Sequence, residues 1–175
     1  ADINIADAAQ QIAGPNARTL LGRISNIDVS NTAFPFLAVR QGEVGLTDAI
    51  VQRVSYTGGP GYEIYVDASQ QLALYEALMA AGSDLGLRPF GMRAMMSLRL
   101  EKGFGSWLRE YKPDYGPLET GLDRFVKYDK PDFIGRAAAV AERERGVSRK
   151  PATLIVQAQD ADVHGDEPIW HDGRI

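Results

Sequence analysis

The segment VSYTGGPGYEIYV, residues 54–66, constrains the fold more than any other part of the chain. Two runs rich in β-branched and aromatic residues flank Thr57-Gly58-Gly59-Pro60-Gly61, so the segment predicts two antiparallel strands joined by a loop. A simple hairpin needs two turn residues, often Asn-Gly, and this loop instead places glycines around a proline. Glycines usually supply positive φ angles in a turn. They also remove side chains from one rim, which would let a flat ligand approach the backbone.

Glu63 lies inside the second run, and alternation along a strand directs it to the face opposite Tyr62. If that face is the core, the carboxylate needs a partner, because an unpaired buried charge is costly. A ligand with two parallel N–H groups would suit it, as arginine does. If that face is exposed to solvent, Glu63 needs no partner. Periodicity alone leaves both interpretations open.

The composition favours one globular core and excludes several kinds of site. Of the 175 residues, 45% are hydrophobic and 24% are charged, with a net charge of −4, which favours neither disorder nor nucleic-acid binding. The chain has no cysteine, so a disulfide framework, a thiolate metal site and a cysteine nucleophile are excluded. No run reaches the roughly 18 apolar residues of a membrane-spanning helix, and we expect an intracellular protein without membrane association.

Hydrophobic periodicity predicts strands and helices mixed without regular βαβ alternation, which is typical of an α+β fold. Strands are expected over residues 2–7, 34–44, 49–57, 62–68, 124–128 and 152–159. Helices are expected over 16–24, from a cap at Ser69 to Gly82, over Gly91–Lys102 and over Gly135–Arg145. The inward-facing residues predicted for the second and third helices are Leu72, Tyr75, Leu78, Met79, Met92, Met95, Met96 and Leu100.

A basic link over residues 146–150 predicts a domain boundary, with one domain over 1–146 and a truncated second domain over 147–175. The chain opens directly on a strand-like run without methionine. At the other end the turn residues His171-Asp172-Gly173 are followed by only two residues of a returning strand. Because a hairpin with one arm missing presents an unpaired edge, we expect this chain to be a fragment of a longer protein.

Other polar and aromatic side chains are weaker site candidates. Arg93 lies near a helix N-terminus, where the helix dipole disfavours a cation, so it is either a ligand contact or a solvated arginine. Arg99 is expected to form a structural ion pair. Trp107 lies in a glycine-rich loop, where it either covers the core edge or stacks on a planar ligand. His164 and His171 lie among acidic residues without the spacing of metal ligands, which predicts a solvated loop and no metal site.

Five blocks of the sequence resemble, in order and spacing, the glycine-cleavage T-protein (aminomethyltransferase) superfamily. They are GPNARTLLGRI, DVSNTAFPF, RVSYTGGPGYEIYV, GLRPFGMRAMMSLRLEKGFGSW and GLDRFVKYDKPDFIGRAA. SLRLEKGFGSWLREYKPDYGPLETGLDRFV and DADVHGDEPIWHDG look most like the folate-binding C-terminal part of dimethylglycine and sarcosine dehydrogenases. The resemblance implies an α+β fold, with the second ferredoxin-like half of a folate-binding domain followed by the start of a C-terminal β-barrel.

The resemblance also implies a site for tetrahydrofolate. In the family, a tyrosine and a glutamate of the hairpin contact the pterin, which gives these roles to Tyr56 and Glu63. Arg93 and Trp107 match positions that line the folate site. The family usually reads T-G-E at the turn, and Gly59 stands here in place of that glutamate. The family's catalytic aspartate belongs to a segment upstream of this chain, so we expect no catalytic residue here and no activity of the fragment alone.

The resemblance implies a parent enzyme of the dimethylglycine or sarcosine dehydrogenase kind, with FAD in a missing N-terminal half. Such an enzyme oxidises an N-methylglycine and passes the one-carbon unit to tetrahydrofolate as 5,10-methylenetetrahydrofolate. One alternative is a stand-alone aminomethyltransferase that works with a lipoyl-carrier protein. Another is a non-catalytic folate-binding module, whose relatives carry K-G-C-Y where this chain has Lys102-Gly103-Phe104-Gly105. The implied location is the cytoplasm of a bacterium or the mitochondrial matrix of a eukaryote.

Overall fold

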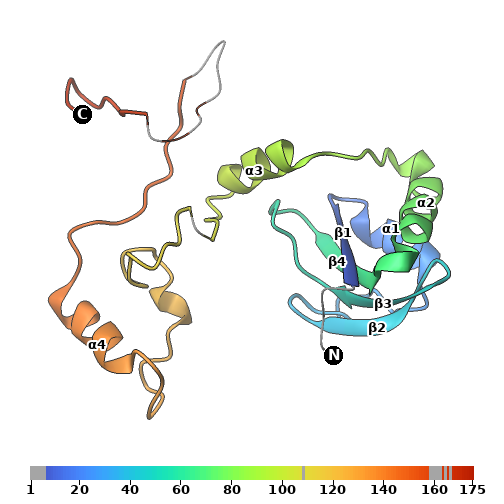
Figure 1. Cartoon of the computed structure of the whole chain (residues 1–175), viewed down its shortest axis with the longest axis horizontal. Helices are drawn as coiled ribbons and strands as arrows, with labels where there is room; N and C mark the ends of the chain where they lie inside the picture. Colours follow the sequence, from blue (N-terminus) through green and yellow to red (C-terminus); the bar gives the residue numbers. More distant parts are fainter. Residues whose placement is uncertain (1–6, 108, 158–162, 164, 166) are drawn as a thin grey trace. The chain divides into compact units, whose positions relative to one another are not determined.

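The computed structural model describes residues 7–107, 109–157, 163, 165 and 167–175. The chain divides into two compact units, one ending at Gly105 and the other beginning at Ser106 (Figure 1). Within the described residues, none of the helices combines the length and the apolar character needed to cross a bilayer. The α+β class predicted from the sequence is confirmed.

The first unit is built on a four-stranded sheet in which every neighbouring pair of strands is antiparallel. Its strands are β1 (Asp7–Ala13), β2 (Val39–Val44), β3 (Thr47–Gln52) and β4 (Gly61–Asp67). The strand order is β1-β4-β3-β2, so β1 and β2 form the two edges. The predicted pairing around the glycine-rich loop is confirmed, although residues 53–57 lie in the loop and not in a strand.

Two helices pack on one face of this sheet. They are α1 (Ala17–Ile24) and α2 (Gln71–Ala81). Tyr62, Ile64 and Val66 alternate along β4 and are all buried. They form one core with Leu20, Leu21, Leu74 and Leu78 of the helices. Burying one such side chain contributes about 1.5–3 kcal/mol, so the core fixes which face of β4 the helices cover.

The order of elements differs from the predicted ferredoxin-like half. Such a fold runs β-α-β-β-α-β, with a helix between its third and fourth strands. Here β4 follows β3 through a loop, and α2 comes only after β4. The difference has a local cause, because the loop over residues 53–60 returns the chain directly to an antiparallel neighbour of β3. The ferredoxin-like prediction is therefore wrong for the described elements.

The face predicted for α2 is partly wrong. Leu78 is buried as expected, but Leu72 is 66% exposed, Tyr75 is 43% exposed, and Leu74 is the second buried residue of the helix. The helix carries apolar residues on more than one side, and the side of Leu74 and Leu78 is the one that packs into the core. The start of the helix also differs from the prediction. The carboxylate of Asp67, not Ser69, caps a 3₁₀ turn over residues 68–70, and the α-helix begins only at Gln71.

Helix α3 (Met92–Glu101) has the predicted position, but its predicted inward set is wrong at both ends. Met92 is 68% exposed and Leu100 is 47% exposed, whereas Arg99 is buried. The guanidinium of Arg99 donates from Nη1 to the carbonyl oxygen of Phe104 at 2.9 Å, just beyond the helix end. That bond places an arginine on the face that the methionine pattern was expected to fill. The ion pair predicted for Arg99 stays a prediction.

The second unit contains α4 (Arg136–Arg145), which ends at Gly146 as predicted. The strand expected over 124–128 is wrong: Asp123–Phe125 is a 3₁₀ turn closed by local backbone hydrogen bonds, and the Phe125 side chain is 66% exposed. Residues 152–157 form no strand, and 158–159 lie outside the described residues. A bridge between His171 and Arg174 confirms the turn expected there, with positive φ at Asp172 and Gly173. The predicted domain boundary near 146 and the β-barrel stay predictions.

Candidate functional site

The structure settles which face of the sheet carries Glu63. Tyr62 is 1% exposed and belongs to the core, so its neighbour Glu63 lies on the face turned away from α1 and α2. We call this the outer face, and four of its side chains are Gln11, Gln52, Glu63 and Tyr65. Glu63 is half-buried there. It is therefore neither a core carboxylate nor a fully solvated one.

Tyr65 fixes the carboxylate of Glu63. Its phenol lies two residues along the same strand, so it points to the same face, and it donates to Oε2 of Glu63 at 2.6 Å. This hydrogen bond is the largest cause that raises the pKa of Tyr65 to about 12, and burial and the negative charge of Glu63 act in the same direction. The carboxylate is thus held by a neutral donor and keeps capacity to accept further hydrogen bonds on both oxygens.

Two glutamines flank Glu63 across the sheet. Gln11 of β1 and Gln52 of β3 lie directly opposite Glu63 in the two strand registers. Nε2 of Gln11 is buried and has no hydrogen-bond partner among the described residues. The outer face thus presents a row of amide, carboxylate and amide groups at one height of the sheet.

Close contacts within the chain require glycine at two positions of the glycine-rich loop. Gly58 has φ +80°, and a Cβ there would lie 2.1 Å from Cγ of Lys102, whose side chain crosses this position. A Cβ on Gly61 would lie 2.9 Å from the carbonyl oxygen of Ile12. Close approach of other parts of the chain therefore explains these glycines, and the proposed approach of a ligand stays a prediction.

Tyr56 ties the same loop to the segment after α3. Its side chain is half-buried, and its Oη donates to the carbonyl oxygen of Gly105 at 2.9 Å. Together with Lys102 over Gly58, this bond attaches the loop to residues 102–105. At its other side the loop joins β1, because the amide of Gly14 donates to the carbonyl oxygen of Pro60 at 2.8 Å.

The four residues predicted for the site do not form one hydrogen-bonded cluster among the described residues. Tyr56 and Glu63 belong to the loop and to β4 of the first unit. Arg93 is an exposed residue in the first turn of α3. Trp107 belongs to the second unit, where it is 75% exposed and bridges to Tyr111. No group of acidic and histidine side chains suitable for a metal ion occurs in the described part of the chain, and His164 lies outside it.

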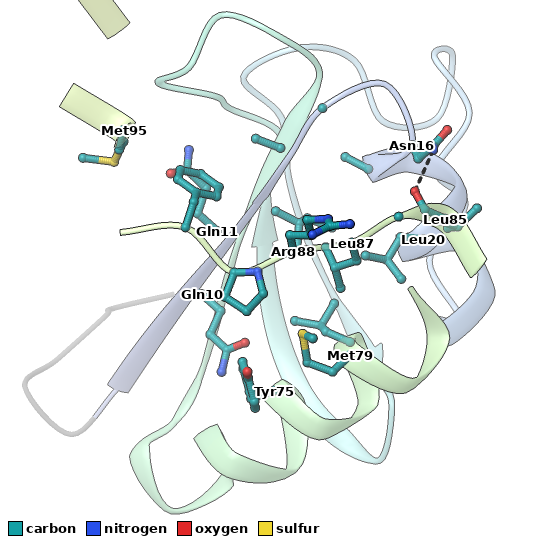
Figure 2. Close-up of a pocket in the computed structure, with 18 of the residues that line it drawn as sticks. Gln10, Gln11, Asn16, Leu20, Tyr75, Met79, Leu85, Leu87, Arg88 and Met95 are labelled. Atoms are coloured by element: carbon teal, nitrogen blue, oxygen red, sulfur yellow. Dashed lines mark hydrogen bonds between the residues drawn. The ribbon is translucent and has the colours of Figure 1, made fainter. Parts of the chain in front are cut away.

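Sequence reasoning missed a pocket of about 830 Å³ beside β1. Figure 2 shows its wall, to which β1, α1, α2, the segment after α2 and the start of α3 contribute. Among the labelled side chains are Gln10, Gln11, Tyr75, Met79, Leu87, Arg88 and Met95. No periodic pattern in the sequence predicts such a pocket, because the pocket depends on the path of residues 85–91 past the edge strand β1.

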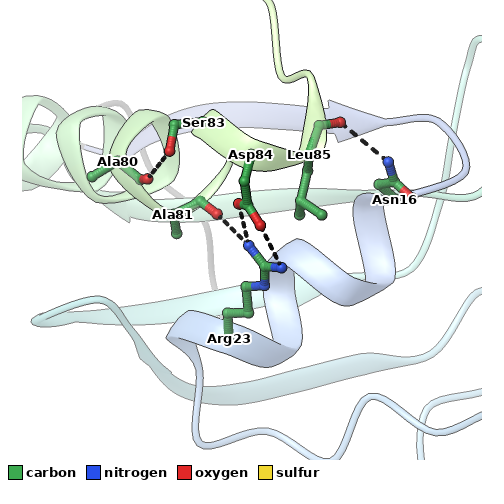
Figure 3. A network of polar contacts seen from close by, with 7 residues as sticks. All are labelled: Asn16, Arg23, Ala80, Ala81, Ser83, Asp84 and Leu85. Atoms are coloured by element: carbon green, nitrogen blue, oxygen red, sulfur yellow. Dashed lines mark hydrogen bonds and ion pairs between the residues drawn. The ribbon is translucent and has the colours of Figure 1, made fainter.

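A polar network holds one wall of this pocket (Figure 3). The guanidinium of Arg23 on α1 binds both carboxylate oxygens of Asp84, at 2.5 and 3.0 Å, and donates to the carbonyl oxygen of Ala81. Asn16 donates to the carbonyl oxygen of Leu85 at 3.1 Å. The hydrogen bond from Arg23 lowers the pKa of the Asp84 carboxyl group. These contacts fasten the end of α2 to α1.

Sequence reasoning also missed Gln11 and Tyr65. Tyr65 could have been found, because a residue two positions after Glu63 on a strand must share its face. Gln11 could not, because its place beside Glu63 depends on a register between strands that are far apart in the sequence.

Comparisons with known proteins agree with this architecture. Human dimethylglycine dehydrogenase, a mitochondrial protein, is 40% identical over 94% of this chain and 19% of its own length. The aminomethyltransferase of Halothermothrix orenii is 36% identical over 91% of this chain and 44% of its own length. The crystal structure of the glycine cleavage system aminomethyltransferase T of Bartonella henselae superposes with a TM-score of 0.69 at 26% identity, over 82% of this chain and 38% of that protein.

The chain thus spans less than half of the length of these relatives. The family pattern described as the GCVT N-terminal domain matches residues 2–130, which include the whole sheet, the outer face and the loop of Tyr56. With this match and the fold it shares with the aminomethyltransferase structure, the chain belongs to the GCVT N-terminal domain family.

Proposed function

We propose that this chain is the tetrahydrofolate-binding part of a one-carbon-transfer enzyme, with Glu63 as the group that binds the pterin. The observation that carries the proposal is the half-buried carboxylate of Glu63 on the outer face, held by the phenol of Tyr65. A carboxylate oriented in this way is a prepared acceptor for a flat pair of donors. The N3–H and the 2-amino group of a pterin are such a pair.

The other predicted residues are assigned supporting roles in the same proposal. Tyr56 and Arg93 would line the folate site from the loop and from α3, and Trp107 would offer an aromatic surface for stacking. The catalytic aspartate would lie in a part of the full-length protein outside this chain, so that the chain alone would be inactive. The proposed domain division is a folate-binding domain over 1–146 and the beginning of a C-terminal β-barrel domain over 147–175.

The parent that we propose is an FAD-dependent dimethylglycine or sarcosine dehydrogenase that forms 5,10-methylenetetrahydrofolate. The relationship to dimethylglycine dehydrogenase at 40% identity supports it. Its substrates would be folate and an N-methylglycine, and its location the mitochondrial matrix in a eukaryote or the cytoplasm in a bacterium. The alternative is an aminomethyltransferase that works with a lipoyl-carrier protein, which the 36% identity to that enzyme favours almost as well.

The sequence of the full-length protein separates these parents. A dimethylglycine or sarcosine dehydrogenase requires an FAD-binding segment with a fingerprint such as G-x-G-x-x-G upstream of this chain. A full-length protein without any dinucleotide-binding segment would contradict the dehydrogenase. A substituted catalytic aspartate would instead favour a non-catalytic folate-binding module, although Phe104 stands here where those relatives carry the cysteine of their K-G-C-Y motif.

The site is tested by Glu63→Gln in the full-length protein that carries this sequence. The substitution replaces one acceptor oxygen by an N–H that faces a donor of the pterin. We expect folate affinity to fall by about 2–4 kcal/mol, because a desolvated polar group is left unpaired. Affinity is measured by calorimetry with 5-formyltetrahydrofolate, and folding is checked by denaturant titration.

A matched control is Glu43→Gln. Glu43 is an exposed glutamate of β2, so the same chemical change there should leave folate affinity unaltered. If a folded Glu63→Gln variant binds folate with the same affinity as the unsubstituted protein, Glu63 is an ordinary strand residue and the assignment of the site is wrong.

A further inference from the structure

The carboxamide of Gln11 is a buried donor without a partner. No hydrogen-bond acceptor within the described residues reaches its Nε2, and the atom is closed to solvent. The great majority of buried polar groups in folded proteins are hydrogen-bonded, because an unpaired one destabilises the fold. A buried donor that the described residues leave unpaired, directly opposite the proposed ligand contact Glu63 on the neighbouring strand, points to an acceptor that comes with the ligand.

The strand register places Gln11 beside Glu63. Gly14 donates to Pro60 across the two strands, so hydrogen-bonded pairs fall at every second position from there, and Ile12 with Tyr62 is one of them. Gln11 and Glu63 are therefore a non-hydrogen-bonded pair, in which the Cα atoms are only about 4.5 Å apart and the side chains run close together. Because Ile12 and Tyr62 face the core, this pair faces outward.

The two side chains together present one donor next to two acceptors. The carboxylate of Glu63 accepts from Tyr65 on Oε2, and each of its oxygens still has a free lone pair. A 2-amino-4-oxopyrimidine ring presents the complementary order along one edge: the 4-oxo acceptor, the N3–H donor and the 2-amino donor. The pterin of folate carries this edge.

We propose that Gln11 is a specificity-determining residue of the folate site, whose carboxamide donates to the 4-oxo group while Glu63 binds N3–H and the 2-amino group. The inference rests on the proposed function of the outer face. It adds that the site recognises the 4-oxo group of the ring as well as the N3–H and 2-amino donors. It also gives the buried carboxamide of Gln11 an acceptor that the described residues do not supply.

Gln10 is the natural control, because it has the same side chain on the same strand with opposite orientation. Its Nε2 donates to the carbonyl oxygen of Gln71 at 3.0 Å, so it is paired within the chain. Removing its carboxamide should alter local contacts on the helix side and leave the outer face unchanged.

The test measures binding of 5-formyltetrahydrofolate by calorimetry, and ligand-free Tm, in the full-length protein carrying this sequence. We expect Gln11→Leu to weaken binding about tenfold or more, as loss of one hydrogen bond to a desolvated acceptor does. We expect its ligand-free Tm to equal or exceed that of the parent, because an unpaired buried donor has been removed. Gln10→Leu should change binding by less than about twofold.

Gln11→Glu supplies a second readout that a structural role would not give. At pH 8 its carboxylate faces the 4-oxo acceptor, so binding should be weaker than in Gln11→Leu. The ratio of its affinity to that of the parent should rise as the pH is lowered toward 5, because a protonated glutamate donates to the 4-oxo group.

The experiment distinguishes a failure of the inference about Gln11 from a failure of the proposed function. If Glu63→Gln weakens binding but Gln11→Leu does not, the inference about Gln11 is wrong and the proposed function stands. If Gln11→Leu lowers affinity and Tm together, with no pH dependence in Gln11→Glu, Gln11 is a structural residue and the inference is overturned. If the parent protein does not bind 5-formyltetrahydrofolate, the proposed function fails and the inference fails with it.

Discussion

Replacing Tyr65 by phenylalanine should remove a stabilising contact whose strength depends on pH in a defined direction. The phenol donates to Glu63 at 2.6 Å, and this raises the pKa of Tyr65 from 10.0 to about 12. Because the pKa is higher in the folded protein than in the unfolded chain, the protonated phenol stabilises the fold. The contribution is complete below pH 10 and is lost between pH 10 and 12, where a tyrosinate would face the carboxylate.

The magnitude follows from the pKa. One pKa unit corresponds to 1.36 kcal/mol, so a rise to about 12 sets a ceiling of roughly 2.7 kcal/mol on the contribution. Tyr65 and Glu63 are both only half-buried, and solvent screens such a pair strongly. We therefore expect Tyr65→Phe to lower the free energy of unfolding by on the order of 1 kcal/mol at pH 8, and by close to zero near pH 12.

The assay is urea unfolding of the parent chain and of Tyr65→Phe at pH 8, 10 and 11.5, followed by circular dichroism. The difference between the two proteins cancels the ionisation of the other tyrosines and lysines. Tyr75→Phe, an exposed tyrosine of α2, serves as a control for the loss of a phenol. A difference that is the same at all three pH values would refute the reasoning, and so would no difference at pH 8.

Two further predictions concern the elements around the site. Gly58→Ala should lower the free energy of unfolding by about 1–2 kcal/mol in denaturant titration, because a left-handed φ of +80° is strained for alanine and Lys102 must move. Gly59→Ala, with no atom nearer than 3.9 Å, should stay within about 0.5 kcal/mol, and equal losses at both positions would contradict this account. Arg23→Ala should lower the Tm at low salt and less so in 1 M NaCl. The contribution of Asp84 should be present above its ordinary pKa of 3.8 and lost as the pH falls below it, and a Tm difference unaffected by salt and acid would count against the ion pair.

Much of the first unit could be predicted because its signals are local. Helix α1 follows from apolar residues at helical spacing, and Leu20 and Leu21 are buried as that spacing requires. The pairing of β3 with β4 follows from two strand-like runs around a loop. The buried face of α2 could not be predicted, because the helix carries apolar residues on more than one side and packing in the core selects the side of Leu74 and Leu78. Its start at Gln71 could not be predicted either, because the Asp67 cap and a 3₁₀ turn precede it.

In the candidate site, too, some features follow from local sequence patterns and others do not. Glu63 and its alternation with Tyr62 could be predicted, but which of them faces the core could not, because periodicity is symmetric between the two faces. The row of Gln11, Glu63 and Gln52 requires registers between β1, β4 and β3, which no local pattern contains. The roles of Arg93 and Trp107 came from the family resemblance alone and stay predictions.

The core on one face of β4 determines the geometry of the site on the other. A shift of β4 by one residue would move Tyr62 and Ile64 to the outer face and turn Glu63 toward Leu74. The shift would cost several kcal/mol in exposed apolar area and in an unpaired buried charge, so the register is strongly specified. The same argument holds for β1, where burial of Ile12 opposite Tyr62 fixes Gln11 beside Glu63. The spacing between the amide and the carboxylate is therefore set by packing that touches neither group. The proposed folate site would therefore have its geometry before the ligand binds.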